Sequence, residues 1–147
     1  MKQALYQICQ NFIDKKKTVL NQAFATITDG MDNETKSSVG DKFETTRAHL
    51  QIEQNNLHLQ LNEVNTLETT LKSIDLDKKS AAVALGSLVF TTKSNYYIAI
   101  PIGKMQVNET VVYGISMASP IGKLLMGKHV GDQFTFNGKT SEITEIH

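Results

Sequence analysis

The chain of 147 residues is 40% apolar and 20% charged, which suits one or two small domains with packed cores and argues against wholesale disorder. Lysine plus arginine and aspartate plus glutamate number 15 each, so no global positive field marks a nucleic-acid or membrane binder. The single cysteine, Cys9, excludes an internal disulfide and a cysteine-rich zinc site.

The N-terminal segment shows no targeting signal. The opening MKQALYQICQ lacks the apolar stretch of a secretory signal. No apolar run in the chain approaches the roughly 20 residues that a membrane-spanning helix needs. We therefore expect a cytoplasmic protein that does not associate with membranes.

Residues 1–80 predict two long helices with one break. They contain no proline and only two glycines, Gly30 and Gly40, which lie close together. In the second helix, positions spaced alternately by four and three form a coiled-coil seam with three polar interruptions: Phe43, Arg47, Leu50, Gln54, Leu57, Leu61, Val64, Glu68 and Leu71. The same spacing in the first helix selects Ile13, Lys17, Leu20, Phe24, Ile27 and Met31. A second stripe is expected to widen the seam in places: Ile52, Leu59, Leu67 and Ile74.

Two such stripes joined by a short polar connection predict an antiparallel helical hairpin. Arms of about 35 residues extend about 50 Å at a rise of 1.5 Å per residue, which is longer than a small globular core requires. The seam is imperfect at Arg47, Gln54 and Glu68, which favours one intramolecular partner over a long symmetric dimer. We therefore expect a monomer.

The charged residues 75–80 predict a junction, and we place the boundary between a hairpin domain, 1–76, and a second domain, 77–147. Beyond the junction the apolar period changes to two, and strands are expected within 87–93, 96–101, 109–116, 133–137 and 141–147. Ser119-Pro120 predicts the start of a short helix over 121–126 that Gly127 ends. These elements make an α+β domain. Its expected core includes Val111, Tyr113, Ile115, Leu124, Leu125 and Phe134.

The connection between the two helices is acidic. Five of the chain's 15 acids fall within residues 29–44: Asp29, Asp32, Glu34, Asp41 and Glu44. Asp41 and Glu44 are three residues apart at the start of the second helix, so they share one face. Acids in a first turn stabilise the helix through its macrodipole, and this role needs no ligand. Alternatively the pair is offered to Mg²⁺, which takes one or two protein carboxylates when another molecule supplies the remaining ligands.

The second half carries the run Ser119-Pro-Ile-Gly-Lys-Leu-Leu-Met-Gly-Lys128, then Gly131-Asp132 and a terminal strand, Ile143 to Ile146. This run is similar to the C-terminal signature of the Gre family of bacterial transcript-cleavage factors. Gly40-Asp41 followed by Glu44 resembles the tip motif of that family. The order of elements also resembles it, with a helical hairpin, a short junction and a domain of FKBP-like fold. After the glutamate the family usually continues Asn-Ala-Glu-Tyr, whereas this chain has Thr-Thr-Arg-Ala.

The resemblance implies a bacterial transcription elongation factor that binds RNA polymerase, inserts the hairpin tip into the secondary channel and stimulates cleavage of backtracked RNA. Asp41 and Glu44 are the implied catalytic carboxylates, which hold the second Mg²⁺ of the polymerase site. Two metal ions clamp the attacking and leaving oxygens of such a displacement. The factor has no cofactor of its own, shares this Mg²⁺ with the polymerase, and is not an enzyme by itself.

The resemblance also implies the partner-binding residues. It assigns polymerase binding to the second domain, where the matched positions are Ser119, Pro120, Gly122, Lys123, Gly127 and Lys128. On the first helix, the basic run Lys15, Lys16 and Lys17 is a candidate contact for nascent RNA or the polymerase channel. Three consecutive lysines point in different directions, so a solvated helix face is the alternative.

Two other functions remain open at this stage. The residues after Glu44 motivate a secondary-channel regulator without cleavage activity. A different class is an FKBP-like chaperone or prolyl isomerase, whose pocket is lined with aromatic residues. The candidate aromatics here are Phe90, Tyr96, Tyr97, Tyr113, Phe134 and Phe136, although strand cores use the same residue types.

Overall fold

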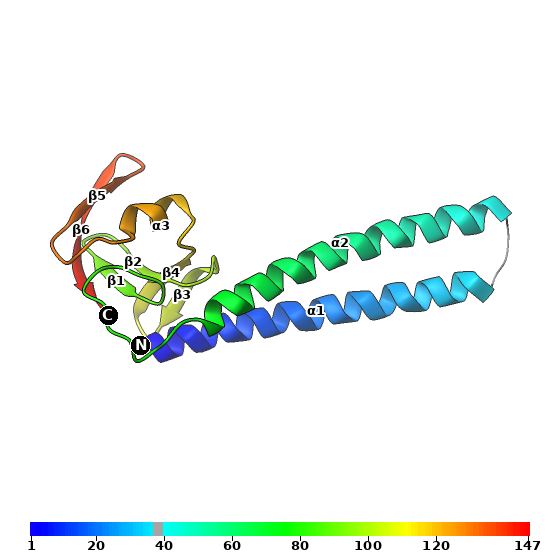
Figure 1. Ribbon diagram of the computed structural model, residues 1–147, viewed down its shortest axis with the longest axis horizontal. Helices are drawn as coiled ribbons and strands as arrows, with labels where there is room; N and C mark the ends of the chain where they lie inside the picture. The colour runs from blue at the N-terminus through cyan, green and yellow to red at the C-terminus, as the bar shows by residue number, and fades with distance from the viewer. Residues whose placement is uncertain (37–39) are drawn as a thin grey trace. The chain divides into compact units, whose positions relative to one another are not determined.

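The computed structural model describes residues 1–36 and 40–147, without the side chains of 33–36 and 40–43. Two long helices, α1 (Lys2–Lys36) and α2 (Gly40–Lys72), precede six strands and a short helix α3 (Pro120–Leu125). The strands are β1 (Leu88–Thr91), β2 (Asn95–Ile98), β3 (Gly103–Val107), β4 (Thr110–Ile115), β5 (Gln133–Phe136) and β6 (Lys139–Ile146) (Figure 1). This order confirms the expected α+β architecture of a helical hairpin followed by a sheet domain with one short helix.

The contacts divide the chain into two units. One unit is Ile13–Glu68, the greater part of the hairpin, and the other joins Met1–Phe12 to Thr69–His147. The first turns of α1 therefore belong to the same compact unit as the sheet domain. The sequence-based boundary at residue 76 stays a prediction.

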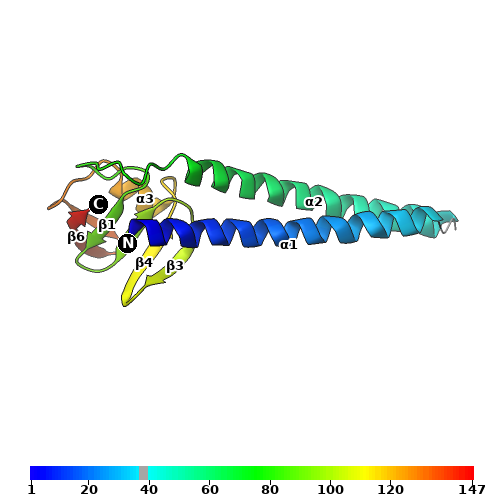
Figure 2. The same cartoon turned by 90° about the horizontal axis from the view of Figure 1, so that it is seen from below.

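In the hairpin unit, α1 and α2 run antiparallel and side by side, as the two perpendicular views agree (Figures 1 and 2). The predicted seam lies between them: Ile13, Leu20, Ile27 and Val64 are at most 6% exposed. The remaining seam residues of this unit are half-buried: Lys17, Phe24, Met31, Leu50, Gln54, Leu57, Leu61 and Glu68. Arg47 is the exception, because it is exposed. The side chain of Phe43 lies outside the described residues.

The second apolar stripe is only partly what the spacing predicts. Ile74 is buried and Leu67 half-buried, but Ile52 and Leu59 are 58% and 62% exposed. A two-helix hairpin offers each helix only one neighbour, so a stripe beside the seam remains in solvent. The expectation that Ile52 and Leu59 widen the seam is therefore wrong.

The six strands form one sheet in the order β3-β4-β2-β1-β6-β5. Neighbours are antiparallel except β2 and β4, which run parallel with Tyr96 opposite Tyr113. The last two strands meet at Asn137-Gly138, where φ is 52° and 75°. These positive values are what a two-residue hairpin turn requires, and they confirm the sequence signal for it.

One face of the sheet packs on α3. The core on this face comprises Val83, Val89, Ile98, Ile121, Leu125, Phe134 and Ile143, with Tyr96 and Ile115 packed against it. Leu125 and Phe134 were expected in the core and are buried there. Leu124 and Tyr113 were expected too, but they are 37% and 39% exposed. Helix α3 turns Leu124 to solvent because Ile121, Gly122 and Leu125 occupy its buried face.

The sequence does not predict strand β3. Only Met105 of its five residues is buried, and Gly103 begins it with φ +83°. An edge strand with one buried side chain carries almost no alternating pattern, so pairing with β4 alone defines it.

Candidate functional site

The connecting end of the hairpin is acidic in the part that the structure describes. Asp29 and Asp32 lie exposed in the last turns of α1, and Glu44 lies exposed near the start of α2. Asp41 is the second residue of α2, one turn before Glu44, but its side chain lies outside the described residues, as does that of Glu34. The structure thus places three accessible carboxylates at the end where the helices connect.

These carboxylates have the ligand chemistry that a hard cation prefers, but they do not gather into a binding group. Carboxylate oxygens are the ligands that Mg²⁺ prefers, and Glu44 is accessible to a second molecule. Within the described residues, however, no group of three or more potential ligands gathers in metal-binding proximity. The N-terminus of α2 also carries partial positive charge, which opposes a lone cation there. A metal held by these exposed carboxylates would need further ligands, such as a second protein could supply.

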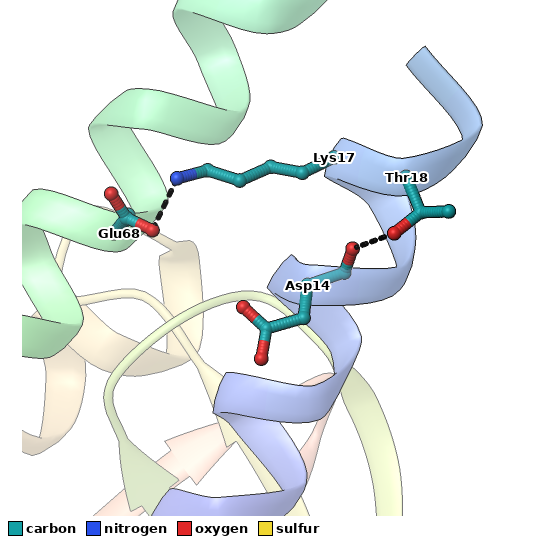
Figure 3. A network of polar contacts seen from close by, with 4 residues as sticks. All are labelled: Asp14, Lys17, Thr18 and Glu68. Atoms are coloured by element: carbon teal, nitrogen blue, oxygen red, sulfur yellow. Dashed lines mark hydrogen bonds and ion pairs between the residues drawn. The ribbon is translucent and has the colours of Figure 1, made fainter. Parts of the chain in front are cut away.

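The basic run on α1 is divided by the hairpin geometry. Lys15 and Lys16 are exposed, whereas Lys17 occupies a seam position and its side chain reaches α2. Its Nζ atom lies 2.5 Å from Oε2 of Glu68 (Figure 3). Beside it, the Thr18 hydroxyl donates to the backbone carbonyl of Asp14 on the same helix. Lys17 is thus engaged within the hairpin, and Lys15 and Lys16 are the members of the run that face outward.

The segment matched to the C-terminal signature is built around a helix cap. Ser119 precedes α3, and its Oγ accepts a hydrogen bond from the backbone N–H of Gly122 at 3.0 Å. The same hydroxyl donates to the carbonyl of Ser116 at 2.7 Å. Pro120 takes the first helical position, where its missing N–H costs nothing. The Ser119-Pro120 signal for a helix start is confirmed.

Two glycines of this segment have backbone reasons to be glycine. A Cβ on Gly122 would lie 2.0 Å from the Ser116 carbonyl oxygen, far inside contact distance. Gly127 has φ +79°, the left-handed conformation that ends a helix. Its N–H donates to the Val83 carbonyl, while the Val83 N–H donates to the Lys128 carbonyl. The backbone conformation of this segment therefore depends on Ser119, Pro120, Gly122 and Gly127.

The side chains that this segment presents to solvent are of a different kind. Lys123 is exposed and Lys128 half-exposed. Apolar side chains accompany them, because Met117, Leu124 and Val130 are 38%, 37% and 57% exposed. Lysines beside accessible apolar groups make a surface suited to a protein partner.

Two buried titratable groups lie in the unit that contains the sheet domain, Cys9 on α1 and Tyr97 on β2. Burial raises the pKa of the Cys9 thiol to about 11, which makes it a poor nucleophile. Burial, followed by the proximity of Cys9 and Tyr6, raises the pKa of Tyr97, whose hydroxyl finds no hydrogen-bond partner among the described residues. Desolvation lowers the pKa of Lys2, although Asp75 acts in the opposite direction. Cys9 is the packing residue that its apolar sequence context suggests.

The aromatic residues considered for a prolyl-isomerase pocket are dispersed. Tyr97 and Phe134 are buried, and Tyr96 and Phe136 pack on the α3 core. Phe90 borders one hollow, and Tyr113 borders another.

Sequence reasoning missed two pairings. One is the ion pair of Lys17 with Glu68. The available signal was that each residue is a polar interruption in the apolar seam of its helix. The other is the packing of the Phe24 ring on His58, with ring centroids 4.8 Å apart. His58 is not a seam residue, so its partner depends on the relative rotation of the helices.

Among the described residues, no helix combines the length and apolar character that crossing a membrane requires. No family model matches the sequence, and no curated protein does. Three solved structures align with 97% of this chain. Two are GreA factor homolog 1 (Gfh1) of Thermus thermophilus and the transcription factor Gfh1, with sequence identities of 19% and 18%. The alignments cover 94% and 92% of their own chains, and both TM-scores are 0.36. The third is Gfh1 of Thermus aquaticus, with 21% identity, 93% covered and a TM-score of 0.37.

Proposed function

We propose that this chain is an accessory factor of the Gre type, which binds RNA polymerase and stimulates cleavage of backtracked RNA. In this proposal the hairpin enters the secondary channel, and Asp41 and Glu44 supply ligands to the second Mg²⁺ of the polymerase. The factor adds these ligands to another protein's active site, so the chain itself catalyses nothing. When bound, the Mg²⁺ stabilises charge on the oxygens of the displacement.

The observation that carries the proposal is the acidic connecting end of a long helical hairpin. The pair α1 and α2 is held together by its seam, and carboxylates of Asp29, Asp32 and Glu44 are exposed where the helices connect. Acids held at the end of a narrow rod can enter a channel that would exclude a globular domain. The described carboxylates of this end do not form a ligand group of their own, which fits a metal site that the partner completes.

The surface around α3 supports the second half of the proposal, which is binding to the polymerase. The matched residues Ser119, Pro120, Gly122 and Gly127 form the cap and turn that display Lys123 beside exposed Leu124. In the proposal, Lys123 and Lys128 contact the polymerase, and the other four matched residues maintain the surface. Lys15 and Lys16 contact RNA or the channel wall, while Lys17 holds the hairpin together.

The test is RNA cleavage in a backtracked elongation complex of the polymerase from the same organism. Wild type is compared with the Asp41→Ala, Glu44→Ala double variant and with Glu63→Ala, which removes an exposed acid from the second half of α2. We expect Mg²⁺-dependent shortening of the RNA with wild type and with Glu63→Ala, and none with the double variant. Competition binding to the polymerase should be equal for all three.

Three other results would separate the alternatives. Wild type that binds and slows the polymerase without cleaving RNA would identify the secondary-channel regulator, which the residues Thr45 to Ala48 motivate. Wild type that does not bind the polymerase would overturn the proposal altogether. Catalysis of prolyl isomerisation in a short peptide would favour the FKBP-like helper, and we expect no such activity.

A further inference from the structure

A hollow of about 540 Å³ opens on the sheet domain beside the edge strand β3. It lies where the turn between β1 and β2 meets the hairpin of β3 and β4. Its polar and aromatic lining includes Lys93, Ser94, Lys104, Glu109, Thr110 and Tyr113. We call these six residues the edge hollow. None of them belongs to the signature segment around α3 or to the acidic end of the helical hairpin.

The backbone of the edge hollow is fixed by local hydrogen bonds. The Thr91 hydroxyl closes the first turn, because it donates to the Ser94 carbonyl and accepts from the N–H groups of Lys93 and Ser94. The Asn95 side chain then ties this turn to β4 by donating to the Val111 carbonyl at 3.1 Å. Lys93 and Ser94 are thus held at a set place beside β4, so the hollow is formed before any ligand arrives.

Two aromatic side chains lie in register across the sheet next to the two lysines. Tyr113 is directly opposite Lys104 on one side and opposite Tyr96 on the other, so all three side chains project from one face. The Tyr96 and Tyr113 rings are 6.3 Å apart between centroids and inclined by 40°. Tyr96 packs on the core, whereas Tyr113 is 39% exposed. The supported ring of Tyr113 can therefore stack on a planar group from solvent.

The charges and hydroxyls of the edge hollow are available to a ligand. Lys93 and Lys104 are exposed, and no ion pair engages either of them in the described part of the chain. Two lysines outweigh the single carboxylate of Glu109, so the hollow is locally positive although the chain has no net charge. The hydroxyls of Ser94 and Thr110 supply further polar groups on the same rim.

We propose that the edge hollow binds a single-stranded nucleic-acid segment, with a base stacked on Tyr113 and the adjacent phosphates held by Lys93 and Lys104. Lysines that follow a phosphate backbone, together with an accessible aromatic ring, are the features that bind unpaired nucleotides. An acidic protein segment would use the lysines but would have no planar group for Tyr113. The inference does not depend on the proposed polymerase function, and it concerns residues other than the lysine run of α1.

The test uses the whole protein alone and a short fluorescein-labelled oligouridylate, with binding followed by fluorescence anisotropy over a series of KCl concentrations. Tyr113→Leu should weaken binding about tenfold, since loss of one stacked base costs about 1–3 kcal/mol. Lys104→Gln should weaken binding and lower the slope of log affinity against log salt by roughly 0.7, because one phosphate contact is lost on a single strand. Lys139→Gln removes an exposed lysine from β6, outside the hollow, and should change neither quantity.

Glu109→Gln provides a test that misfolding cannot imitate, because removal of the one carboxylate should tighten binding severalfold. A matched oligodeoxyuridylate distinguishes the two sources of this chemistry. Equal affinity for the two oligonucleotides would mean that only the base and the phosphates are bound. A higher affinity for the oligouridylate would mean that the protein also contacts the 2′-hydroxyl. The inference is overturned if no oligonucleotide binds. It is also overturned if Tyr113→Leu binds like wild type while polyglutamate displaces the probe, because an acidic protein is then the partner.

Discussion

Lys17 and Glu68 join the two long helices through an ion pair, with Nζ 2.5 Å from Oε2. Both residues occupy seam positions that the apolar pattern leaves polar. Their side chains are 31% and 20% exposed, so each charge is partly removed from water and needs the other. Since only one alignment of α1 against α2 brings the two together, the pair specifies the register of the hairpin.

Exchanging the two charges tests this relationship. Lys17→Glu alone places two carboxylates together in the seam and should lower the free energy of unfolding by about 1–3 kcal/mol, between the values for exposed and buried pairs. The double variant Lys17→Glu, Glu68→Lys should recover most of the loss. Urea unfolding followed by circular dichroism measures both changes. A double variant no more stable than the single variant would show that the pair contributes no specific attraction.

The two apolar stripes of the hairpin should differ in their effect on stability under the same substitution. Leu20 is 6% exposed in the seam, and Leu59 is 62% exposed beside it. We expect Leu20→Ala to cost about 2–5 kcal/mol through lost burial and a cavity. Leu59→Ala should stay within about 0.5 kcal/mol of wild type. Thermal unfolding of the two variants gives the comparison, and a large loss with Leu59→Ala would mean that this face is covered in solution.

The Gly122 backbone leaves no space for a side chain. Gly122→Ala sets a Cβ against the Ser116 carbonyl, so the turn before α3 must shift at a cost of about 1–3 kcal/mol. Lys123→Gln changes the adjacent exposed residue and should leave the unfolding temperature unchanged. If the two variants are equally stable, Gly122 has no structural role. The polymerase affinities of the two variants show whether binding depends on the shape of this segment, which Gly122→Ala changes, or on its charge, which Lys123→Gln changes.

Loss of the Ser119 cap should weaken α3 by itself. Ser119→Ala removes the acceptor for the Gly122 N–H and should cost about 1 kcal/mol, whereas Ser119→Asp should keep most of the cap. Differential scanning calorimetry measures the two variants against wild type. Equal losses from alanine and aspartate would indicate that the bond from Ser119 Oγ to the Ser116 carbonyl matters more than the cap.

The buried thiol makes stability depend on alkaline pH. Burial raises the folded-state pKa of Cys9 to about 11, whereas an unfolded thiol titrates near pH 8.5. The folded state thus holds its proton more tightly, and this contribution to stability is complete below about pH 8.5 and lost as the pH rises toward 11. The raised pKa of Tyr97 acts in the same direction at higher pH.

Unfolding temperatures measured across that range check the effect of Cys9. The unfolding temperature of wild type should fall more steeply between about pH 8.5 and 11 than that of Cys9→Ala. Of the two buried groups, this variant keeps only Tyr97 as a source of pH dependence. Native protein should also react slowly with a thiol reagent at neutral pH and rapidly once unfolded. Parallel pH profiles for the two proteins would contradict the burial of the thiol.

Much of this architecture follows from the sequence because local patterns carry it. The seam from Ile13 to Leu71, the cap at Ser119 and the turn at Asn137-Gly138 each depend on residues within a few positions of one another. Their spacing or backbone preference determines them before any distant contact forms. The acidic cluster at 29–44 is likewise a property of composition, and it suffices to mark the end of the hairpin as a candidate site.

The tertiary structure alone decided which of these residues meet. The pattern cannot tell that Lys17 pairs with Glu68, because the two are 51 positions apart and their contact depends on the register of the helices. Ile52 and Leu59 are exposed because a second helix covers only one face of α2. The spacing of apolar residues does not show how many helices pack against them. Strand β3 and the edge hollow beside it arise from pairing with β4, which places Lys104 opposite Tyr113. These contacts join distant parts of the chain, so only folding determines them.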